Sequence, residues 1–407
     1  MKIIVYEHVS GGGYCENPIP PSFLAEGFAM IRSITADFKA AGHIVTVLLD
    51  ARLSALNPPI DADFIVPILY ANEPKQFLSN IAKVNDAVYI IAPETGKELP
   101  SMVKLIEETG KVALNCKSEA IAKVTDKAFL CMELEKNGFS VPKTLVLKKD
   151  VDMNQIKHSI FRELTYPLIF KPSDGVGANG LSIIEDEKQI EKALSKINLQ
   201  SAKDDFIVQE FIKGEPASVS VLSTGKKALG ISLNRQKVKV SGPDQSSSYE
   251  GGIVPFEHSL KDFALALAEK VVESFPGLRG YVGVDIVLAG DTVFVLDVNP
   301  RLTTSYVGLR KVANFNIAEA LISSVVLGKL PLKTEIYGFS CFSKQQTPKP
   351  TMAEYQKASK LASIVSPPFP LEGNNESYAL SIGSAENIEI ACSASEEAKK
   401  QLKDIII

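Results

Sequence analysis

The sequence lacks the residue patterns of several common catalytic and binding sites. Its four histidines are scattered and its five cysteines form no C-x-x-C pair, so no zinc site is predicted. An odd number of cysteines without paired spacing is typical of a reducing compartment. The patterns G-x-x-x-x-G-K-S/T and G-x-S-x-G are absent as well, which excludes a P-loop and leaves a hydrolase nucleophile without support.

The sequence also has no strong excess of one charge and no long apolar runs. The net charge is −4 and no segment is strongly basic, which argues against nucleic acid as the main partner. The uncharged apolar run at 320–328 is far shorter than the ~20 residues needed to cross a bilayer. Glu7 follows the first short apolar burst, so no secretory segment is predicted. These absences predict a cytoplasmic globular protein with neither nucleic acid nor membrane as a partner.

The first 115 residues alternate strand patterns with helix patterns. At roughly 150 residues per domain, a chain of 407 residues is expected to form two or three domains. Short β-branched runs occur at 2–6, 44–49, 63–68, 86–93 and 111–115. Such βαβα alternation predicts a parallel sheet covered by helices on both faces. We therefore expect a Rossmann-like α/β domain over residues 1–115.

The pattern changes after residue 116. A helix is predicted over 119–137, and strands then come in pairs joined by glycine-rich turns, which indicates α+β structure with antiparallel hairpins. A last helix is expected over 315–328, ending at Gly328. Proline-rich segments then precede and interrupt the tail. We expect a second domain over 116–335 and a small, mostly β C-terminal unit over 336–407.

Two glycine-rich segments are candidates for binding a nucleotide or a substrate. GVGANG (175–180) matches G-x-G-x-x-G, but a strand pattern follows Gly180 where a dinucleotide fingerprint requires a helix. We interpret it as a flap between strands whose backbone N–H groups close over phosphates, with Lys171 placing an ammonium nearby; a plain hairpin turn is the alternative. SGGGY (10–14) follows the first strand and is either a substrate-binding segment or a connector.

The strongest constellation lies in GYVGVDIVLAGDTVFVLDVNPR (280–301). Asp285 and Asp297 lie in apolar strands, where ionised carboxylates are costly without a cation. Asp297, Asn299 and Arg301 follow at intervals of two and therefore share one face. Oxygen ligands of this kind suit Mg²⁺ held jointly with substrate phosphates. Structural salt bridges are the alternative, but they leave Asp285 without an obvious partner.

The register of this hairpin decides whether the two aspartates can meet. A turn centred on Asp291 makes Asp285 and Asp297 direct neighbours and places Gly283 opposite Asn299. A two-residue Gly290–Asp291 turn, which local turn chemistry favours, would send the aspartates to opposite faces. Because carboxylates on opposite faces cannot share a cation, we expect an odd or bulged turn.

Three segments taken in order resemble the ATP-grasp ligases. They are YPLIFKPSDGVGANG (166–180), IVQEFIKGE (207–215) and GVDIVL with LDVNPR (283–301). The resemblance covers roughly residues 115–330. It implies that ATP lies between two α+β subdomains, the flap subdomain spanning about 140–208, behind a Rossmann-like domain.

The same resemblance assigns roles to individual residues. Arg301 would steady the transferred phosphoryl group, and Asp285, Asp297 and Asn299 would hold Mg²⁺ or Mn²⁺. The family usually has at least one glutamate in the metal pair, whereas both residues here are aspartates. The residues assigned to ATP are the phosphate-binding Lys127 and Lys171, the flap glycines Gly175, Gly177 and Gly180, the adenine-side strand Glu210, Phe211 and Ile212, and the ribose candidate Glu215.

Four further segments resemble a narrower group, the archaeal ligases that join glutamate to tyramine in methanofuran biosynthesis. They are EHVSGGGYCE (7–16), APETG (92–96), SLNRQ (232–236) and YEGGIVPF (249–256). SLNRQ also resembles an arginine-bearing segment of biotin-dependent carboxylases, which makes Arg235 a candidate for the substrate carboxylate or acyl phosphate. A structural arginine is the alternative.

The resemblance implies an ATP-dependent carboxylate–amine ligase that forms an amide through an acyl phosphate. Glutamate and tyramine are the implied substrates, and a different acid and amine on the same machinery is the nearest alternative. A non-catalytic nucleotide-binding regulator is the alternative outside enzymes. The intact set of phosphate and metal residues counts against a regulator. No base for the amine is identified, although Glu250, beside two glycines, is a candidate.

Overall fold

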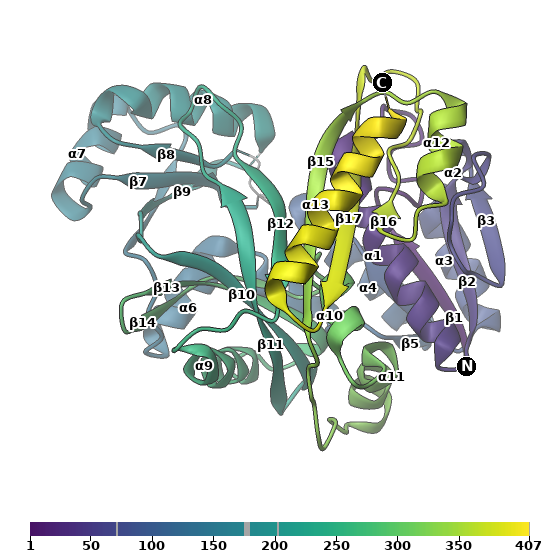
Figure 1. Ribbon diagram of the computed structural model, residues 1–407. Helices are drawn as coiled ribbons and strands as arrows, with labels where there is room; N and C mark the ends of the chain where they lie inside the picture. Colours follow the sequence, from purple (N-terminus) through teal and green to yellow (C-terminus); the bar gives the residue numbers. More distant parts are fainter. Residues whose placement is uncertain (71, 175–179, 202, 407) are drawn as a thin grey trace.

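The computed structural model describes residues 1–70, 72–174, 180–201 and 203–406. These residues form three sheets of five, four and eight strands (Figure 1). The five-stranded sheet belongs to the N-terminal part of the chain. The four-stranded sheet with its two helices stands apart from the rest of the molecule in Figure 1 and joins it at one side. The eight-stranded sheet runs through the middle.

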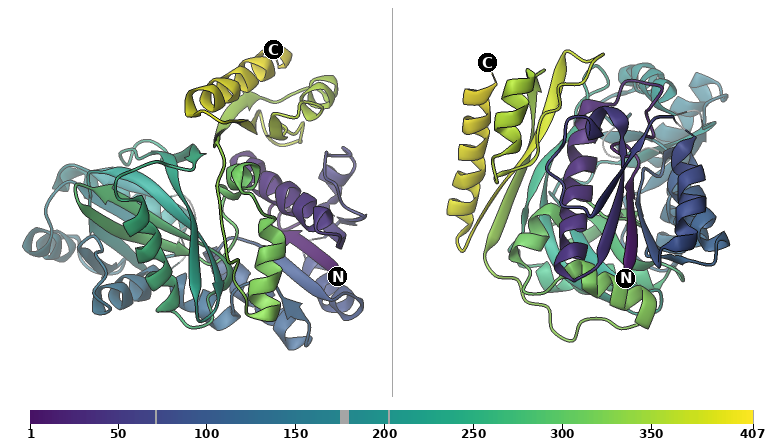
Figure 2. Two further views of the ribbon diagram at one scale, coloured as in Figure 1. Left: turned by 60° about the horizontal axis from the view of Figure 1, so that its bottom comes forward. Right: turned by 90° about the vertical axis from the view of Figure 1, so that its right-hand side faces the viewer.

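The N-terminal sheet is parallel, with strand order β3-β2-β1-β4-β5. Its long helix α1 packs against Ile3 and Val5, while α3 and α4 pack against Ile4 and Tyr6, so helices cover both faces (Figure 2). The Rossmann-like expectation is confirmed. The elements are β1 (Lys2–Glu7), α1 (Pro21–Ala40), β2 (Ile44–Asp50), α2 (Ala51–Ser54), β3 (Phe64–Ile68), α3 (Glu73–Ile81), β4 (Ala87–Ile91), α4 (Glu98–Glu108) and β5 (Val112–Ala113), with 3-10 turns at Ala82–Val84 and Thr95–Lys97.

The helix predicted over 119–137 is two helices, α5 (Ser118–Val124) and α6 (Lys127–Lys136). The break comes at Asp126, whose carboxylate accepts a hydrogen bond of 3.0 Å from the backbone N–H of Phe129 and so caps α6. Sequence periodicity continued across this cap and concealed it. The break places Lys127 in the first turn of α6, where the chain enters the four-stranded sheet region.

The four-stranded sheet is antiparallel, in the order β6-β9-β7-β8, and α7 and α8 pack against it. The pairing of β7 with β8 confirms that strands flank the 175–180 segment. The elements are β6 (Thr144–Lys148), α7 (Met153–Glu163), β7 (Leu168–Pro172), β8 (Ser182–Ile184), a 3-10 turn (Glu187–Gln189), α8 (Ile190–Gln200) and β9 (Asp205–Glu210).

The eight-stranded sheet has the order β14-β13-β10-β11-β12-β15-β17-β16, so the C-terminal unit continues the sheet of the second domain through the pairing of β12 with β15. The helix expected over 315–328 is α11 with a π turn that ends at Gly328. The elements are β10 (Glu215–Thr224), β11 (Ala228–Lys239), β12 (Ser248–Val254), α9 (Lys261–Glu273), β13 (Arg279–Ala289), β14 (Thr292–Asn299), α10 (Tyr306–Val312), α11 (Ile317–Ile322), the π turn (Ser323–Leu327), β15 (Phe339–Pro348), α12 (Met352–Ser359), β16 (Ile364–Ser366), β17 (Glu376–Ala385) and α13 (Ile388–Ile405).

The C-terminal unit differs from the mostly β unit that was expected. Besides three strands it has α12 and the long α13, which lies along β15 and β17 (Figure 1). The buried positions of α13 recur at helical spacing but are mostly small, namely Ala391, Ser395, Ala398 and Leu402. Polar and apolar residues still segregate to opposite faces of α13, and this helical pattern was missed in the sequence.

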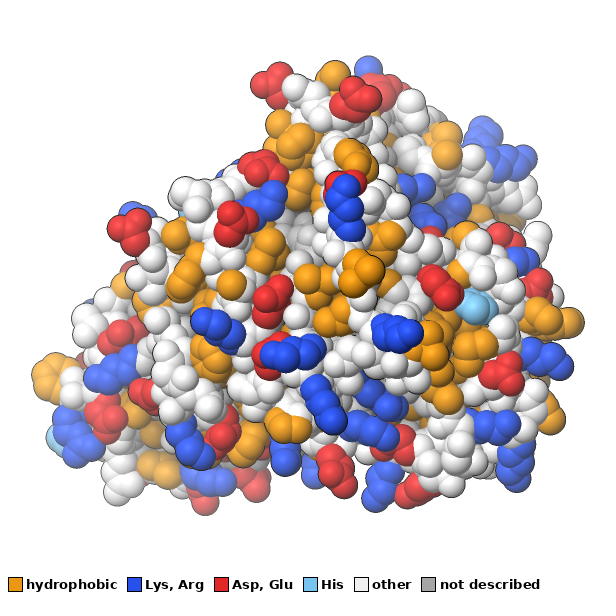
Figure 3. Space-filling model, turned by 90° about the horizontal axis from the view of Figure 1, so that it is seen from below, with side chains coloured by type: hydrophobic (Ala, Val, Ile, Leu, Met, Phe, Trp, Pro, Cys, Tyr) orange, Lys and Arg blue, Asp and Glu red, His pale blue; other side chains and the backbone are white. Residues whose placement is uncertain are grey.

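The surface shows no dominance of one charge on the face seen from below. Lysine and arginine side chains there are interspersed with carboxylates and hydrophobic side chains (Figure 3). Among the described residues no helix is long and apolar enough to span a membrane.

The junction between the second domain and the C-terminal unit depends on the two glycines of YEGGIVPF. Gly251 has a φ of +128°, and a Cβ built there would lie 2.1 Å from the carbonyl oxygen of Phe342 on β15. A Cβ at Gly252 would lie 2.5 Å from the carbonyl oxygen of Arg235. Side chains at these positions would push β12 away from both neighbours.

We therefore predict that Gly251→Ala is more destabilising than an equivalent change where space is open. Gly42→Ala is the matched control, since Gly42 also has positive φ (+82°) but no atom within 4 Å of the built Cβ. The control should cost about 1–2 kcal/mol from backbone strain alone. Gly251→Ala should cost at least about 2 kcal/mol more, because β12 and β15 must separate. Urea unfolding of the two variants tests this, and equal stabilities would contradict it.

Candidate active site

The hairpin of β13 and β14 brings Asp285 directly opposite Asp297, and Gly283 opposite Asn299, as predicted. Near the turn the pairing is different, with Ala289 opposite Thr292, so the turn itself is the two-residue Gly290–Asp291 turn. The register of the hairpin shifts between Asp285 and Ile286, which makes both pairings possible. The extra residue lies in a bulge within β14, not in the turn, and the bulge turns both carboxylates to one face.

The Asp285 carboxylate is held by two side-chain amides. Gln236 on β11 donates from Nε2 to Oδ1 at 2.9 Å, and Asn299 donates from Nδ2 to Oδ2 at 2.9 Å. Removal from water and the nearby negative charge of Asp297 raise the pKa of Asp285 to about 6, against the lowering effect of the two amides. A carboxylate in this position is stabilised by any cation that approaches it.

Asp297 already has a cationic neighbour. The ammonium of Lys127, in the first turn of α6, forms an ion pair with Oδ2, while the backbone N–H of Val298 donates to Oδ1 at 3.0 Å. Burial by itself would lower the pKa of Lys127, but the carboxylates around it, Asp297 first, raise it overall. The lysine therefore stays charged and is directed at the carboxylate pair.

Lys171 on β7 is the second lysine of the group. Burial, and then the positive charge of Lys127, lower its pKa. Among the described residues no carboxylate lies within ion-pair distance of its ammonium. Two lysines that repel each other, one of them without an anionic partner, form a place where phosphate oxygens are stabilised.

Arg301 is fixed by a residue that sequence reasoning did not single out. Its Nε and Nη2 donate to the two carboxylate oxygens of Glu94 at 2.8 and 3.2 Å, and Nη1 donates to the carbonyl of Leu302 at 3.1 Å. Both side chains of the ion pair are nearly buried, with 13% and 10% of their surface exposed. Glu94 follows β4 in the APETG segment, so the pair joins the N-terminal sheet to the hairpin. The remaining N–H on each terminal nitrogen is available to a ligand.

The 175–180 segment lies between β7 and β8. Gly180 has a φ of +72° and is followed by β8, so no helix begins there, and the strand predicted after this segment is confirmed. Gly175 and Gly177 lie outside the described residues.

Glu210, Phe211 and Ile212 form the link between the four-stranded sheet and β10. The N–H of Glu210 donates to Lys143 and that of Phe211 to Pro167, both at 3.0 Å. The described residues offer no hydrogen-bond acceptor to the N–H of Ile212. This backbone edge is thus available to a polar ring at the point where the two sheets meet.

Arg235 and Glu215 lie apart from the carboxylate pair. Arg235 alternates along β11 with Asn234 and Gln236, and the Gln236 amide reaches Asp285, so the guanidinium leaves the strand on the other face. There it lies 3.5 Å from Glu215 and over the ring of Phe256. The segment SLNRQ therefore contributes Gln236, which was missed, to the group around Asp285. Glu250 is exposed and accepts a hydrogen bond from Ser248 at 3.3 Å.

A second polar group, also missed, joins α1, the segment just after Arg301 and β15. Lys344 on β15 forms an ion pair with Glu26 on α1 and donates to Ser22 at 2.9 Å. Thr304 donates to the other oxygen of Glu26 at 2.9 Å. These residues lie far apart in the sequence, so no spacing pattern identified them.

The SGGGY segment forms turns held by Glu7, whose buried carboxylate accepts hydrogen bonds from Val9 and Ser10.

Comparisons with known proteins agree with this geometry. The model of an ATP-grasp domain matches residues 124–305, and that of a pre ATP-grasp 3 domain matches residues 43–121. The tyramine–L-glutamate ligase of Methanocaldococcus jannaschii is 29% identical over 339 residues, covering 82% of this chain and 92% of the relative. That of Methanocaldococcus fervens is 32% identical over 250 residues, or 61% of this chain and 69% of the relative.

A solved structure shares the fold. The biotin carboxylase domain of the Hydrogenobacter thermophilus 2-oxoglutarate carboxylase, in complex with MgADP, ADP and bicarbonate, superposes with a TM-score of 0.71 at 15% identity, over 98% of this chain and 89% of that one. The likeness holds for the fold alone. The matched ATP-grasp domain, residues 124–305, includes Lys127, Lys171, the carboxylate pair and Arg301. The chain belongs to the ATP-grasp superfamily and is an ATP-dependent carboxylate–amine ligase.

Proposed function

We propose that this ligase joins the carboxylate of glutamate to the amine of tyramine and uses ATP with Mg²⁺. The observation that carries the site is the pairing of Asp285 with Asp297 beside two lysines. The substrate pair is supported by the relatives named tyramine–L-glutamate ligase, one of which is matched over 92% of its length.

The donor set fits Mg²⁺. Among the described residues no group of three His, Cys, Asp or Glu side chains is arranged to hold a metal. Mg²⁺ commonly takes one or two carboxylates and completes its shell with water and phosphate oxygens, which is the number that Asp285 and Asp297 provide. Asn299 adds an amide oxygen that accepts no hydrogen bond from the described residues. Mn²⁺ takes similar oxygen ligands. When bound, the metal supplies charge neutralisation at the phosphates.

We assign ATP to the junction of the four-stranded sheet with the β13–β14 hairpin of the eight-stranded sheet. Lys127 and Lys171 bind phosphate oxygens and Gly180 closes over them, while Gly175 and Gly177 lie outside the described residues. The backbone of Glu210, Phe211 and Ile212 lies beside adenine, where the free N–H of Ile212 donates to a ring nitrogen. Glu215 is not included in our proposal, because its carboxylate faces Arg235.

The chemistry takes two steps. In the first, a substrate carboxylate oxygen bonds to the γ-phosphorus of ATP and the bond to ADP breaks, giving an acyl phosphate. In the second, the amine nitrogen attacks the acyl carbon, the carbon–oxygen bond to phosphate breaks, and the amide forms with loss of a proton. The two free N–H groups of Arg301 steady the phosphoryl oxygens, and Glu94 fixes the plane of the guanidinium.

Release of ADP across a panel of acids and amines tests the substrate proposal. Glutamate with tyramine should give the highest rate, with one ADP and one phosphate formed for each amide. If another acid or amine gives a higher rate, the substrate pair is wrong although the ligase assignment stands. If no acid and amine of the panel gives ADP release, the result would instead support a nucleotide-binding regulator.

Lys171→Ala should weaken ATP binding about tenfold, the loss expected for one charge-assisted contact. The effect should be the same for every amine accepted, since the lysine acts before the acyl phosphate is used. Lys148→Ala is the matched control, because Lys148 is an exposed lysine of the same sheet. Calorimetry gives the ATP affinity and steady-state kinetics the amine preference. A change in amine preference alone would refute the placement of Lys171.

Asp297→Asn should raise the Mg²⁺ concentration needed for half-maximal activity by at least about tenfold, because one of two metal carboxylates is lost. It also frees Lys127 from its ion pair. Asp291→Asn, at the exposed turn of the same hairpin, is the control and should leave the Mg²⁺ requirement unchanged. Activity titrated with Mg²⁺ at fixed ATP measures both. The same requirement in both variants would exclude Asp297 as a ligand.

A further inference from the structure

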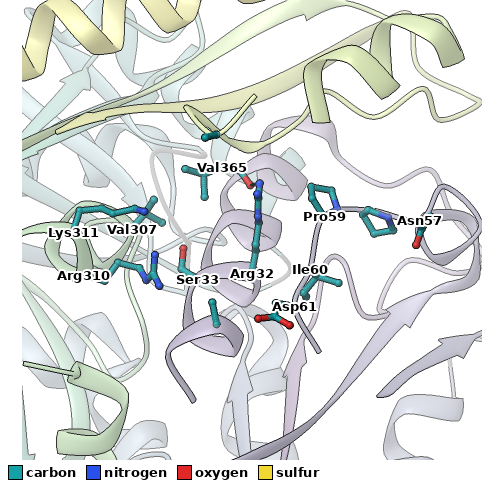
Figure 4. A pocket seen from close by; sticks show the side chains of 13 residues that line it. Arg32, Ser33, Asn57, Pro59, Ile60, Asp61, Val307, Arg310, Lys311 and Val365 are labelled. Atoms are coloured by element: carbon teal, nitrogen blue, oxygen red, sulfur yellow. Dashed lines mark hydrogen bonds between the residues drawn. The ribbon is translucent and has the colours of Figure 1, made fainter. Parts of the chain in front are cut away.

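A cavity of about 500 Å³ lies outside the candidate active site, between α1, the segment 57–61, α10 and β16 (Figure 4). None of the residues assigned above to ATP, metal or phosphoryl transfer lines it. Its volume falls in the range of pockets that hold small molecules. The cavity joins all three parts of the chain, since α1 is N-terminal, α10 follows the Arg301 segment and β16 is C-terminal.

Three cations gather at this cavity. Arg32 comes from α1, and Arg310 and Lys311 come from α10, as Figure 4 shows. Arg310 is compensated, because Nε lies 3.0 and 2.9 Å from the two oxygens of Asp37, and Nη2 adds a further contact. Asp61, the acidic residue of the lining, is compensated by Lys39 at 3.3 Å, which also pairs with Asp63.

Arg32 and Lys311 remain without a carboxylate. The Nη1 of Arg32 donates to the carbonyls of Ile364 and Val365 at 2.9 and 2.8 Å, which hold the side chain in place without neutralising it. Among the described residues neither Arg32 nor Lys311 has an ion-pair partner. Burial and the charge of Arg310 lower the pKa of both groups. Two cations held together against their mutual repulsion are stabilised by an anion between them.

Most of the remaining lining is apolar, and Ser33 and Asn57 are its neutral polar residues. Pro58, Pro59 and Ile60 form one wall, and Val307 and Val365 contribute to the others. Inorganic phosphate alone would leave this surface in contact with water. A ligand with an anionic head and an apolar body satisfies both the cations and the wall.

We propose that this cavity binds a small organic oxyanion, a phosphate or carboxylate group attached to an apolar or aromatic body, at a site separate from the ligase centre. The head lies between Arg32 and Lys311, and the body lies against Pro59 and Ile60. Because the ligand contacts α1, α10 and β16 together, its binding stabilises the arrangement of these three elements.

Phenyl phosphate, benzoate, orthophosphate and the neutral benzyl alcohol are the probes, and calorimetry with the full-length protein gives their affinities. Phenyl phosphate or benzoate should bind and raise the thermal unfolding midpoint, more strongly than orthophosphate or benzyl alcohol. Comparison of phenyl phosphate with benzoate shows which head the site takes. Stronger binding of orthophosphate or benzyl alcohol, or no binding of any anion at millimolar concentration, would overturn the proposal.

Three variants test whether the probe binds in this cavity. Lys311→Glu, on an exposed residue, should weaken binding of the preferred probe about tenfold or more, since an attractive charge becomes repulsive. Lys360→Glu is the matched control on an exposed lysine that has no ion-pair partner among the described residues, and it should bind like the unchanged protein. Lys171→Ala should also bind the probe normally. If Lys171→Ala loses the probe and Lys311→Glu keeps it, the anion occupies the ATP site and the proposal is wrong.

Discussion

The structure depends on two carboxylates that are held side by side where water is scarce. Removal from water and the negative charge of Asp297 beside it both penalise the ionised form of Asp285. The folded chain tolerates the pair because amides from Gln236 and Asn299, a backbone N–H and the ammonium of Lys127 surround it. A pair of this kind is stable only with positive charge close by. The site is thus arranged for a cation and for the phosphates that accompany it, before any ligand is bound.

The cations around the pair come from separate parts of the chain. Lys127 reaches Asp297 because Asp126 ends one helix and caps the next, which turns the lysine inward. Arg301 is oriented by Glu94 from the N-terminal sheet. A guanidinium held by both oxygens of a carboxylate keeps its plane. The N-terminal domain therefore fixes the plane of Arg301, and in our proposal this is its contribution to phosphoryl transfer.

Much of the fold was predictable because it rests on local patterns. The five parallel strands were read from short β-branched runs, and the register of Asp285 with Asp297 followed from the demand that both share a face. The bulge in β14 was not predicted. It allows the favourable Gly290–Asp291 turn to coexist with that register. Sequence analysis also failed to identify four polar residues, Glu94, Gln236, Glu26 and Lys344, for a different reason. Their partners are distant in sequence, and no spacing rule connects residues that only tertiary packing brings together.

Those long-range polar contacts also hold α1 of the N-terminal domain against α10 and the eight-stranded sheet. Glu26 on α1 accepts from Lys344 of the C-terminal unit and from Thr304 just after Arg301, and Asp37 on the same helix binds Arg310 and Tyr306 of α10. Breaking such a partly buried pair leaves a charge without a partner, which costs more than the pair contributes. Helix α1 is thereby tied at two points to the segment 301–310. A ligand that shifts α1 against α10 must therefore strain the contacts of α1 with the segment that follows Arg301.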